Sequence, residues 1–391
     1  MDRSWRTIIL LWLTGVLAAA QLAKLSALAP LLRTRFEMSL PEVSLLISLI
    51  EVGGALFGFV AGLALARIGG RRALVSGLVV LVLATSVEAF APDTRILFIA
   101  RAAEGIGYLC VVIAAPTMIV GFAHNGARRT KALALWSTFV PVGIALGSGL
   151  TGLAITALSL SSTLLLWAVI LAASLIGIAR LQQTPVIPRS IAMPHAAAWL
   201  LTAGFGCYTL FLCALTALLP SFLVAQHGAS LGTASLIAGG VSLAAVPGTA
   251  IALRATHGGD ARPRRILLVA VASLLLAALS APLVYSLGDL ASSGGLAALT
   301  VMLSGTARTL LFTRVPVLSG AVEAADPRIA AANGLLTQFG AAGALMGPPM
   351  GALAVECFGW NGLGLLISLL MLALLVLLVT AEWHGSRRRS T

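Results

Sequence analysis

Long apolar stretches, separated by short clusters of charged or turn-forming residues, dominate the pattern along this chain. Each stretch is about 20 residues or longer, which is the length that a helix needs to cross a hydrocarbon core of about 30 Å. No part of the chain shows the sustained alternation, about ten residues per segment, of a transmembrane β-strand. The pattern predicts an all-α membrane protein with twelve transmembrane helices. We place these helices at residues 7–32, 42–66, 73–91, 95–123, 132–157, 161–181, 196–223, 232–253, 265–286, 294–318, 333–355 and 360–381.

The Arg and Lys residues between the helices alternate strongly from one side to the other. If both termini lie in the cytoplasm, the cytoplasmic segments hold eighteen Arg and Lys residues, whereas the other side holds only Arg33, Arg35 and Arg95. Cytoplasmic loops of membrane proteins retain Arg and Lys in this way. Because the bias follows the alternation of all twelve helices, it supports the helix count as well as the orientation.

A polar segment with three prolines, residues 182–195, divides the chain into two parts of six helices each. We therefore expect an N-terminal bundle over 1–181, a cytoplasmic linker over 182–195, and a C-terminal bundle over 196–391 with a short cytoplasmic tail. The two parts repeat some features, such as an arginine-rich loop after their second helix and an arginine within their fourth. Two pseudo-symmetric six-helix bundles are typical of secondary transporters that bind their substrate near mid-membrane, between the repeats.

The composition excludes most other classes of protein. The chain has 391 residues, of which 59% are hydrophobic and only 10% charged, and its mean hydropathy is +1.03. Soluble domains contain about a quarter charged residues, so a soluble enzyme is excluded, as is a disordered chain. The net charge of +12 is explained by membrane orientation rather than by nucleic-acid binding. The sequence contains neither a phosphate-binding Gly-x-x-x-x-Gly-Lys-Ser/Thr loop nor a cluster typical of metal ligands or of a catalytic triad, so we expect no cofactor.

The loop between the second and third predicted helices carries a motif. The stretch from Gly62 to Arg72, Gly-Leu-Ala-Leu-Ala-Arg-Ile-Gly-Gly-Arg-Arg, resembles the corresponding loop signature of the major facilitator superfamily. That signature has an acidic residue where this chain has Ala66. In the superfamily the loop helps to latch the cytoplasmic side of the outward-open state. The resemblance implies a latch, built differently here, that consists of Gly62, Arg67, Gly69, Arg71 and Arg72.

Two further stretches extend the resemblance. Residues 101–107, Arg-Ala-Ala-Glu-Gly-Ile-Gly, are similar to the superfamily's Arg-x-x-x-Gly-x-Gly element, which is associated with proton coupling or substrate binding. Pro141 and the glycines after it in the fifth helix resemble the Gly/Pro-rich motif of drug:proton antiporters, although the Gly-Pro order is absent. The Arg-x-x-Glu-Gly run, together with Ala115-Pro116, resembles cyanate and nitroimidazole porters. The chain is thus similar to the twelve-helix type of the superfamily, with no subfamily indicated.

Ionisable side chains inside a span cost free energy unless they face a partner or a water-filled passage, and they are therefore the candidates for function. The first helix carries Gln21 and Lys24 on one face, and the second carries Glu51 at a similar expected depth. A pair between Lys24 and Glu51 is geometrically possible if the two helices are neighbours. Such a pair could equally be a fixed structural lock.

The fourth helix places Arg101, Glu104 and Tyr108 on one face at i, i+3 and i+7. An Arg–Glu pair that opens when a substrate or a proton arrives would be a coupling element, and a fixed pair is the alternative. We predict Glu51 and Glu104 as proton-coupling residues. Glu88, nearer the outer end of the third helix, is interpreted as an interfacial side chain.

An arginine within the tenth helix, Arg308, has no carboxylate on its own helix within reach. An unpaired central guanidinium suits a carboxylate or phosphate, because its planar fork binds such groups in a bidentate manner. Tyr208 and Gln338 could add hydrogen bonds, whereas Arg314, near the cytoplasmic end, is expected to extend to the interface. The predicted substrate-binding residues are Gln21, Lys24, Arg101, Tyr108, Tyr208, Arg308 and Gln338.

Together these features predict a secondary active transporter, not an enzyme, that moves a small anionic or amphipathic organic solute by alternating access and is coupled to protons. The alternative is a drug or metabolite efflux antiporter driven by protons. A membrane-embedded enzyme, a sensor and a passive channel have less support in the sequence. The expected partners are a small-molecule substrate, protons and the lipid bilayer, with no nucleic acid and no metal. We expect a monomer in a bacterial cytoplasmic membrane, with both termini in the cytoplasm.

Overall fold

The computed structural model describes residues 3–123, 128, 131–132, 135–136, 138–181, 193–256, 263–286, 288–320 and 327–387. Throughout this part of the chain the regular structure is helical, and it contains no strand. Eleven segments are long and apolar enough to cross a membrane. One of them, Gly334–His384, has 51 residues and would extend for about 75 Å, which is more than twice the thickness of a hydrocarbon core. The all-α membrane fold with twelve spans is therefore confirmed.

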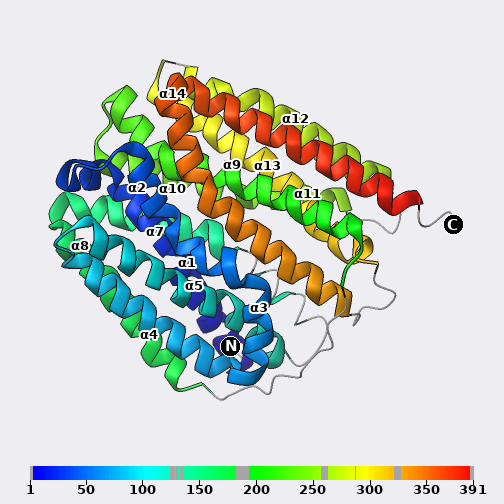
Figure 1. Cartoon of the computed structure of the whole chain (residues 1–391), viewed down its shortest axis with the longest axis horizontal. Coiled ribbons are helices and arrows are strands. Elements are labelled where there is room, and N and C mark those ends of the chain that lie inside the picture. Colours follow the sequence, from blue (N-terminus) through cyan, green and yellow to red (C-terminus); the bar gives the residue numbers. More distant parts are fainter. Residues whose placement is uncertain are drawn as a thin grey trace. The chain divides into compact units, whose positions relative to one another are not determined.

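The chain forms two compact units, and Figure 1 shows the helices of each. The first unit comprises Met1–Pro188 and Ser230–Gly239, and the second comprises Arg189–Ala229 and Gly240–Thr391. The helices of the first unit are α1 (Arg3–Phe36), α2 (Leu40–Ser48), the short 3-10 helix η1 (Leu49–Glu51), α3 (Val52–Ile68), α4 (Gly70–Ala89), α5 (Thr94–Phe122), α7 (Phe139–Ala157) and α8 (Leu160–Ala179).

The second unit begins with α9 (Ala196–His227). Helix α10 (Leu231–Leu243) belongs to both units, because its segment up to Gly239 is grouped with the first. The remaining helices are α11 (Ala245–Thr256), α12 (Pro263–Ser286), α13 (Leu290–Leu318) and α14 (Pro327–Arg387). Of the expected linker 182–195, only residues 193–195 lie within the described part of the chain.

Four predicted helices differ in their continuity from the expected pattern. The second is interrupted by η1, and the eighth is divided between α10 and α11. The last two merge into α14, where Gly359, with φ 68° and ψ −176°, forms a kink. A positive φ is readily available only to glycine. The chain therefore turns at Gly359 without a loop, which the hydrophobic pattern alone does not indicate.

Short polar side chains begin several of these helices. Asp93 accepts a hydrogen bond from the Ile96 N–H (2.9 Å) at the start of α5, and Asp289 accepts one from Ser292 N–H (3.1 Å) at the start of α13. Ser39 and Glu42 form a reciprocal capping box at α2. These caps satisfy backbone donors that have no partner within the helix.

In the first unit, α4 lies between α5 and α8 and packs against both, and α1 packs along α7 and α5 (Figure 1). The interior of this unit is largely apolar, with Leu78, Val111 and Trp167 fully buried. The same interior also buries Lys24 and Arg101, which are among the largest fully buried side chains of the protein. A buried lysine and a buried arginine require partners, and the partners define the candidate site.

Candidate functional site

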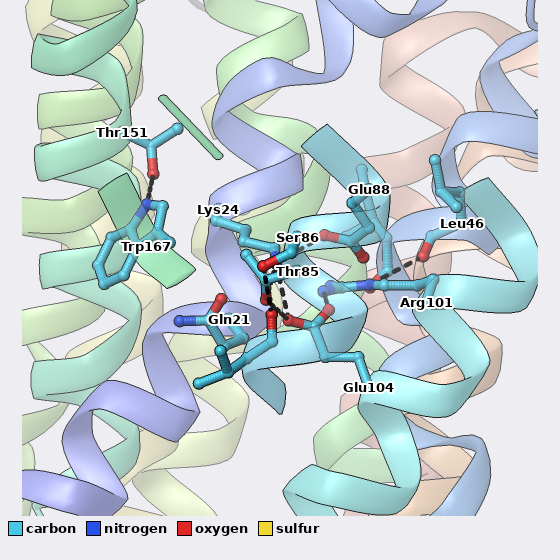
Figure 2. A network of polar contacts seen from close by, with 12 residues as sticks. Gln21, Lys24, Leu46, Thr85, Ser86, Glu88, Arg101, Glu104, Thr151 and Trp167 are labelled. Atoms are coloured by element: carbon cyan, nitrogen blue, oxygen red, sulfur yellow. Dashed lines mark hydrogen bonds and ion pairs between the residues drawn. The ribbon is translucent and has the colours of Figure 1, made fainter. Parts of the chain in front are cut away.

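Lys24, on α1, lies at the centre of a buried polar cluster in the first unit (Figure 2). Its ammonium Nζ is 2.6 Å from Oε2 of Glu88 on α4 and 2.7 Å from Oε1 of Glu104 on α5. It also donates a hydrogen bond of 3.0 Å to the hydroxyl of Thr85. All these side chains are almost completely shielded from solvent. One ammonium group therefore connects three helices through two carboxylates and a hydroxyl.

Arg101, on α5, uses its guanidinium to hold two different elements. Its Nη1 donates to Oε2 of Glu104, one turn further along the same helix, at 2.5 Å. Its Nε and Nη2 donate to the backbone carbonyls of Leu46 (3.2 Å) and Ile47 (2.8 Å) in α2. The expected Arg101–Glu104 pair is therefore present. The same arginine also binds the backbone of α2, a contact that the sequence pattern does not predict.

Glu104 is the best-satisfied carboxylate of this cluster. It accepts hydrogen bonds from Lys24, from Arg101 and from the Thr85 hydroxyl (3.0 Å). Together Lys24, Thr85, Glu88, Arg101 and Glu104, hereafter the Lys24 cluster, contain two cations and two carboxyl groups. When all four are ionised, the cluster has no net charge, as expected for ionic groups kept away from water.

Two sequence-based interpretations change in this light. Lys24 pairs with Glu88 and Glu104, rather than with Glu51 as the spacing of the first two helices allows. The interpretation of Glu88 as an interfacial side chain is wrong, because it is 3% exposed and paired with Lys24. The missed signal is the i, i+3 spacing of Thr85 and Glu88, which places both on one face of α4. This is the same spacing that drew attention to Arg101 and Glu104.

Glu51 lies in η1, where the second span is interrupted, and it is half-buried. Within the described part of the chain it forms no ion pair at 4.0 Å or less, and Arg101 is the charged group that acts on it electrostatically. Arg101 binds the carbonyls of Leu46 and Ile47 in the turn just before this interruption. The predicted coupling residue is thus placed beside the Lys24 cluster, at an irregular segment of helix.

Gln21 and Tyr108 also belong to the first unit. The Gln21 side chain is fully buried one turn from Lys24 on α1, donates a hydrogen bond of 3.0 Å to the Leu17 carbonyl, and leaves its own carbonyl oxygen without a partner among the described residues (Figure 2). Tyr108 is buried on α5, one turn beyond Glu104. The structure thus brings Gln21 close to the cluster, whereas Tyr108 belongs to the buried apolar core of the first unit.

In the second unit, Arg308 lies on α13 and is half-buried. Its guanidinium is 6.0 Å from the ring centroid of Tyr208 on α9, which is at the limit of a cation–π interaction, and 3.5 Å from the Thr249 hydroxyl on α11. No carboxylate lies within 4.0 Å of Arg308 in the described part of the chain. Gln338 lies half-buried on α14.

The other arginine of α13, Arg314, forms a bidentate pair with Glu382 near the end of α14, with N–O distances of 2.5 and 2.7 Å. The sequence predicts that Arg314 extends to the interface and does not indicate this partner. Lys24 and Arg101 are paired as well, so three of the four basic side chains predicted within the spans have carboxylate partners. Among these four, Arg308 alone retains its charge without a carboxylate from the described residues.

Most of the predicted loop motif is helical, and the connection between α3 and α4 consists of one residue, Gly69, with φ 85° and ψ 140°. A turn this short between two helices requires the positive φ that glycine provides. Arg71 donates a hydrogen bond to the Ala179 carbonyl at the end of α8, and Arg72 is exposed. The surroundings of Gly62 and the side chain of Arg67 lie outside the described part of the chain.

No group of His, Cys, Asp and Glu suited to hold a metal ion occurs among the described residues. The four cysteines, all within the described residues, form no disulfide. The polar interactions of the described residues include ion pairs, hydrogen bonds and two arginine–aromatic contacts, Arg308 with Tyr208 and Arg35 with Phe36.

Comparisons with known proteins provide the context for this arrangement. A comparison with curated proteins found no match. Among solved structures, the chain is similar to a bacterial homologue of the human lysosomal transporter Spinster in an inward-facing and occupied conformation. That match has a TM-score of 0.77 at 14% identity and covers 99% of this chain and 98% of the other. The inward-facing and unoccupied form of the homologue matches with a TM-score of 0.74, at the same identity and coverage. At this identity the likeness concerns the fold.

The sequence itself matches the family model of the Major Facilitator Superfamily over residues 11–324. The match extends over most of the chain and includes the loop motif, the Lys24 cluster and Arg308. The chain therefore belongs to the Major Facilitator Superfamily and is a membrane transporter rather than an enzyme.

Proposed function

We propose that this protein carries a small anionic or amphipathic organic solute across the membrane by alternating access, and that proton movement drives the transport. Membership of a transporter superfamily supports the general activity. The charge of the solute and the role of protons are inferred from the two groups of residues described above.

We infer an anionic substrate from the surroundings of Arg308, which contain no carboxylate partner among the described residues. A guanidinium group at membrane depth normally has a carboxylate partner, because an isolated charge there is costly. Arg308 instead has the face of Tyr208 and the hydroxyl of Thr249 near it, with no carboxylate within 4.0 Å among the described residues. An anion that arrives from water would supply the missing charge and could accept two parallel hydrogen bonds. Gln338 is a candidate for a further hydrogen bond.

Proton coupling is proposed to depend on the first unit. The Lys24 cluster and Glu51 together contain three carboxyl groups and two cations in a largely dry environment. When all of them are ionised, one negative charge is in excess. Uptake of one proton would remove that excess, which is the behaviour expected of a coupling site. We propose Glu51 and Glu104, the two carboxyl groups that the sequence indicates, as the coupling residues. The excess of Arg and Lys on one side supports a cytoplasmic location of both termini.

A ligand-binding thermal-shift screen of small organic anions tests the substrate class. A ligand at 100 times its Kd stabilises the folded protein by about 2.7 kcal/mol. We expect at least one carboxylate or phosphate compound to raise the Tm of the wild type, and the shift to be lost in Arg308→Ala and retained in Arg95→Ala. Arg95 is an exposed arginine outside the candidate site and outside the predicted latch, and it serves as the matched control.

Two results would contradict this assignment. If an anion stabilises Arg308→Ala as strongly as the wild type, Arg308 is not its ligand. If several unrelated lipophilic compounds stabilise both proteins equally while no anion does, the efflux antiporter is the better description.

A further inference from the structure

A carboxyl group that the proposed coupling does not use, Glu88, lies in the last turn of α4. Its side chain is buried, and its Oε2 is 2.6 Å from the Lys24 ammonium. Because Lys24 also contacts Glu104 at 2.7 Å, two carboxyl groups share one ammonium. The question is which of the two would release Lys24 more easily.

The hydrogen bonds of the two carboxyl groups are very unequal. Glu104 accepts from Lys24, Thr85 and Arg101. Neither oxygen of Glu88 accepts a hydrogen bond of acceptable geometry from any described residue, so its ion pair with Lys24 is its one ion pair among these residues, and Arg101 acts on it without an ion pair at 4.0 Å or less. A buried carboxylate with so few donors is costly to keep ionised. Proton uptake by Glu88 disrupts one ion pair, whereas uptake by Glu104 would disrupt three contacts.

The position of Glu88 within α4 also favours the neutral form of its carboxyl group. Helix α4 ends at Ala89, and the N–H of Phe90 still bonds to the carbonyls of the last turn. The C-terminal end of a helix carries a partial negative charge, which disfavours a carboxylate in the last turn. The helix itself therefore favours the neutral form of Glu88.

The charged groups around Glu88 come from few elements. Lys24 faces it from α1, and Arg101 and Glu104 act on it from α5. Helix α8, on the other side of α4, contains no ionisable residue over Leu160–Ala179. The basic residues of α4 itself, Arg71 and Arg72, lie at its opposite end. Lys24 is thus the direct counter-charge of Glu88.

We propose that Glu88 is the carboxyl group that exchanges the transported proton, and that Glu104 stays ionised to hold Lys24 and Arg101. This rests on the proposed proton coupling and revises its site: Glu88 takes up the proton in place of Glu104, and Glu104 is a positioning residue that holds Lys24 and Arg101. In the step itself a hydronium ion transfers its proton to a carboxylate oxygen of Glu88: one O–H bond of hydronium breaks, one O–H bond forms on Glu88, and a water molecule is released. The ion pair with Lys24 is lost, while Lys24 remains bound to Glu104 and Thr85. Helix α1 then loses its ionic link to Glu88, so the two protonation states hold α1 and α4 together with different strength.

Infrared difference spectra of the full chain in liposomes, recorded between acidic and alkaline pH, test this directly. The C=O stretch of a buried protonated carboxyl group appears in a region that carboxylates leave empty. We expect a reversible band in the wild type, its loss in Glu88→Gln, and its retention in Glu356→Gln, in which an exposed carboxyl group is removed. In Glu104→Gln the band should move to lower pH, because Lys24 then has Glu88 as its one carboxylate partner.

A band that persists in Glu88→Gln, or the absence of a reversible band in the wild type, would overturn the proposal. If Glu88→Gln does not fold, Glu88→Asp replaces it, and an unchanged pH dependence of the band in that variant is equally contradictory. The measurement needs no solute. Failure of the anion screen at Arg308 would therefore leave this result intact, and the two proposals can fail separately.

Discussion

At the scale of single residues, the feature that distinguishes this protein is the unequal treatment of its buried charges. Lys24, Arg101 and Glu104 are tied together by short contacts of 2.5 and 2.7 Å, whereas Glu51 is half-buried and has no ion pair in the described part of the chain. Removal of one member of a buried ion pair leaves an uncompensated charge and costs about 3–5 kcal/mol. The residues of the cluster should therefore differ sharply from Glu51 in their contribution to stability.

We accordingly expect Glu104→Gln to lower the Tm in detergent at neutral pH much more than Glu51→Gln does. The loss should correspond to about 3–5 kcal/mol for Glu104→Gln, because Arg101 then has no carboxylate within 4.0 Å among the described residues and Lys24 keeps Glu88 alone. Both substitutions keep the side-chain size and remove one charge, so each is the control for the other. Equal losses of Tm would mean that the cluster does not stabilise the fold as its contacts indicate.

Arg101 supports a related prediction. Its guanidinium donates in three directions, to Glu104 and to the carbonyls of Leu46 and Ile47. A lysine at this position keeps the charge but has one compact ammonium, which cannot reproduce the planar fork. Arg101→Lys should keep the pair with Glu104 and release α2, and amide hydrogen exchange should then become faster over residues 46–51. Unchanged exchange there would show that the arginine does not hold this segment.

At the scale of helices, close packing explains how the interruption at η1 is accommodated. A Cβ atom at Gly105 of α5 would lie 2.6 Å from the Ile50 carbonyl oxygen, and one at Gly53 would lie 2.8 Å from the Gly105 carbonyl oxygen. The backbones of the two segments therefore touch, and neither can shift to accept a side chain without moving the other. Only glycine permits this approach, which keeps the Arg101 guanidinium within reach of the carbonyls of α2.

Gly105→Ala tests this close approach. The added methyl group meets backbone rather than a flexible side chain, and overpacking of this kind costs about 1–3 kcal/mol. The matched control is Gly295→Ala in α13, where a Cβ would have no heavy atom within 4 Å. Since alanine favours helix over glycine by about 0.5–1 kcal/mol, the control should be neutral or slightly stabilising. Equal Tm values for the two variants would contradict the proposed contact.

At the scale of the whole molecule, the chain is a member of the Major Facilitator Superfamily with twelve spans. The candidate groups are divided between the units, with the Lys24 cluster in the first and Arg308 in the second. We propose that proton exchange belongs to the first unit and solute binding to the second. Substitutions in the two units should then affect transport in different ways.

Transport into proteoliposomes by an imposed pH gradient would measure this difference, with the anion that the screen identifies as solute. Glu104→Gln should lose uphill accumulation, because Glu104 holds Lys24 beside the proton-exchanging Glu88. It should retain counterflow, because exchange of solute needs no net proton movement. Arg308→Ala should lose both activities. Full uphill accumulation in both Glu51→Gln and Glu104→Gln would refute their role in coupling.

The sequence by itself determined the class of the protein. Apolar stretches of about 20 residues must become helices in a membrane, because no water is present there to satisfy an unpaired backbone. The loop and helix-four motifs, together with these spans, led to the correct superfamily before any tertiary contact was known. Intrahelical neighbours such as Arg101 and Glu104 were also accessible, since helical spacing alone places them side by side.

The partners of the buried charges, by contrast, were decided by the tertiary structure. Helical periodicity defines one face of one helix, but it contains no information about which other helix lies against that face. Helical spacing therefore allows a pair between Lys24 and Glu51, whereas packing brings Lys24 to Glu88 and Glu104. The pairing of Arg314 with Glu382, 68 positions away, could not be read from local spacing for the same reason. Only after these pairs are assigned does Arg308 stand apart as a cation with no carboxylate nearby among the described residues.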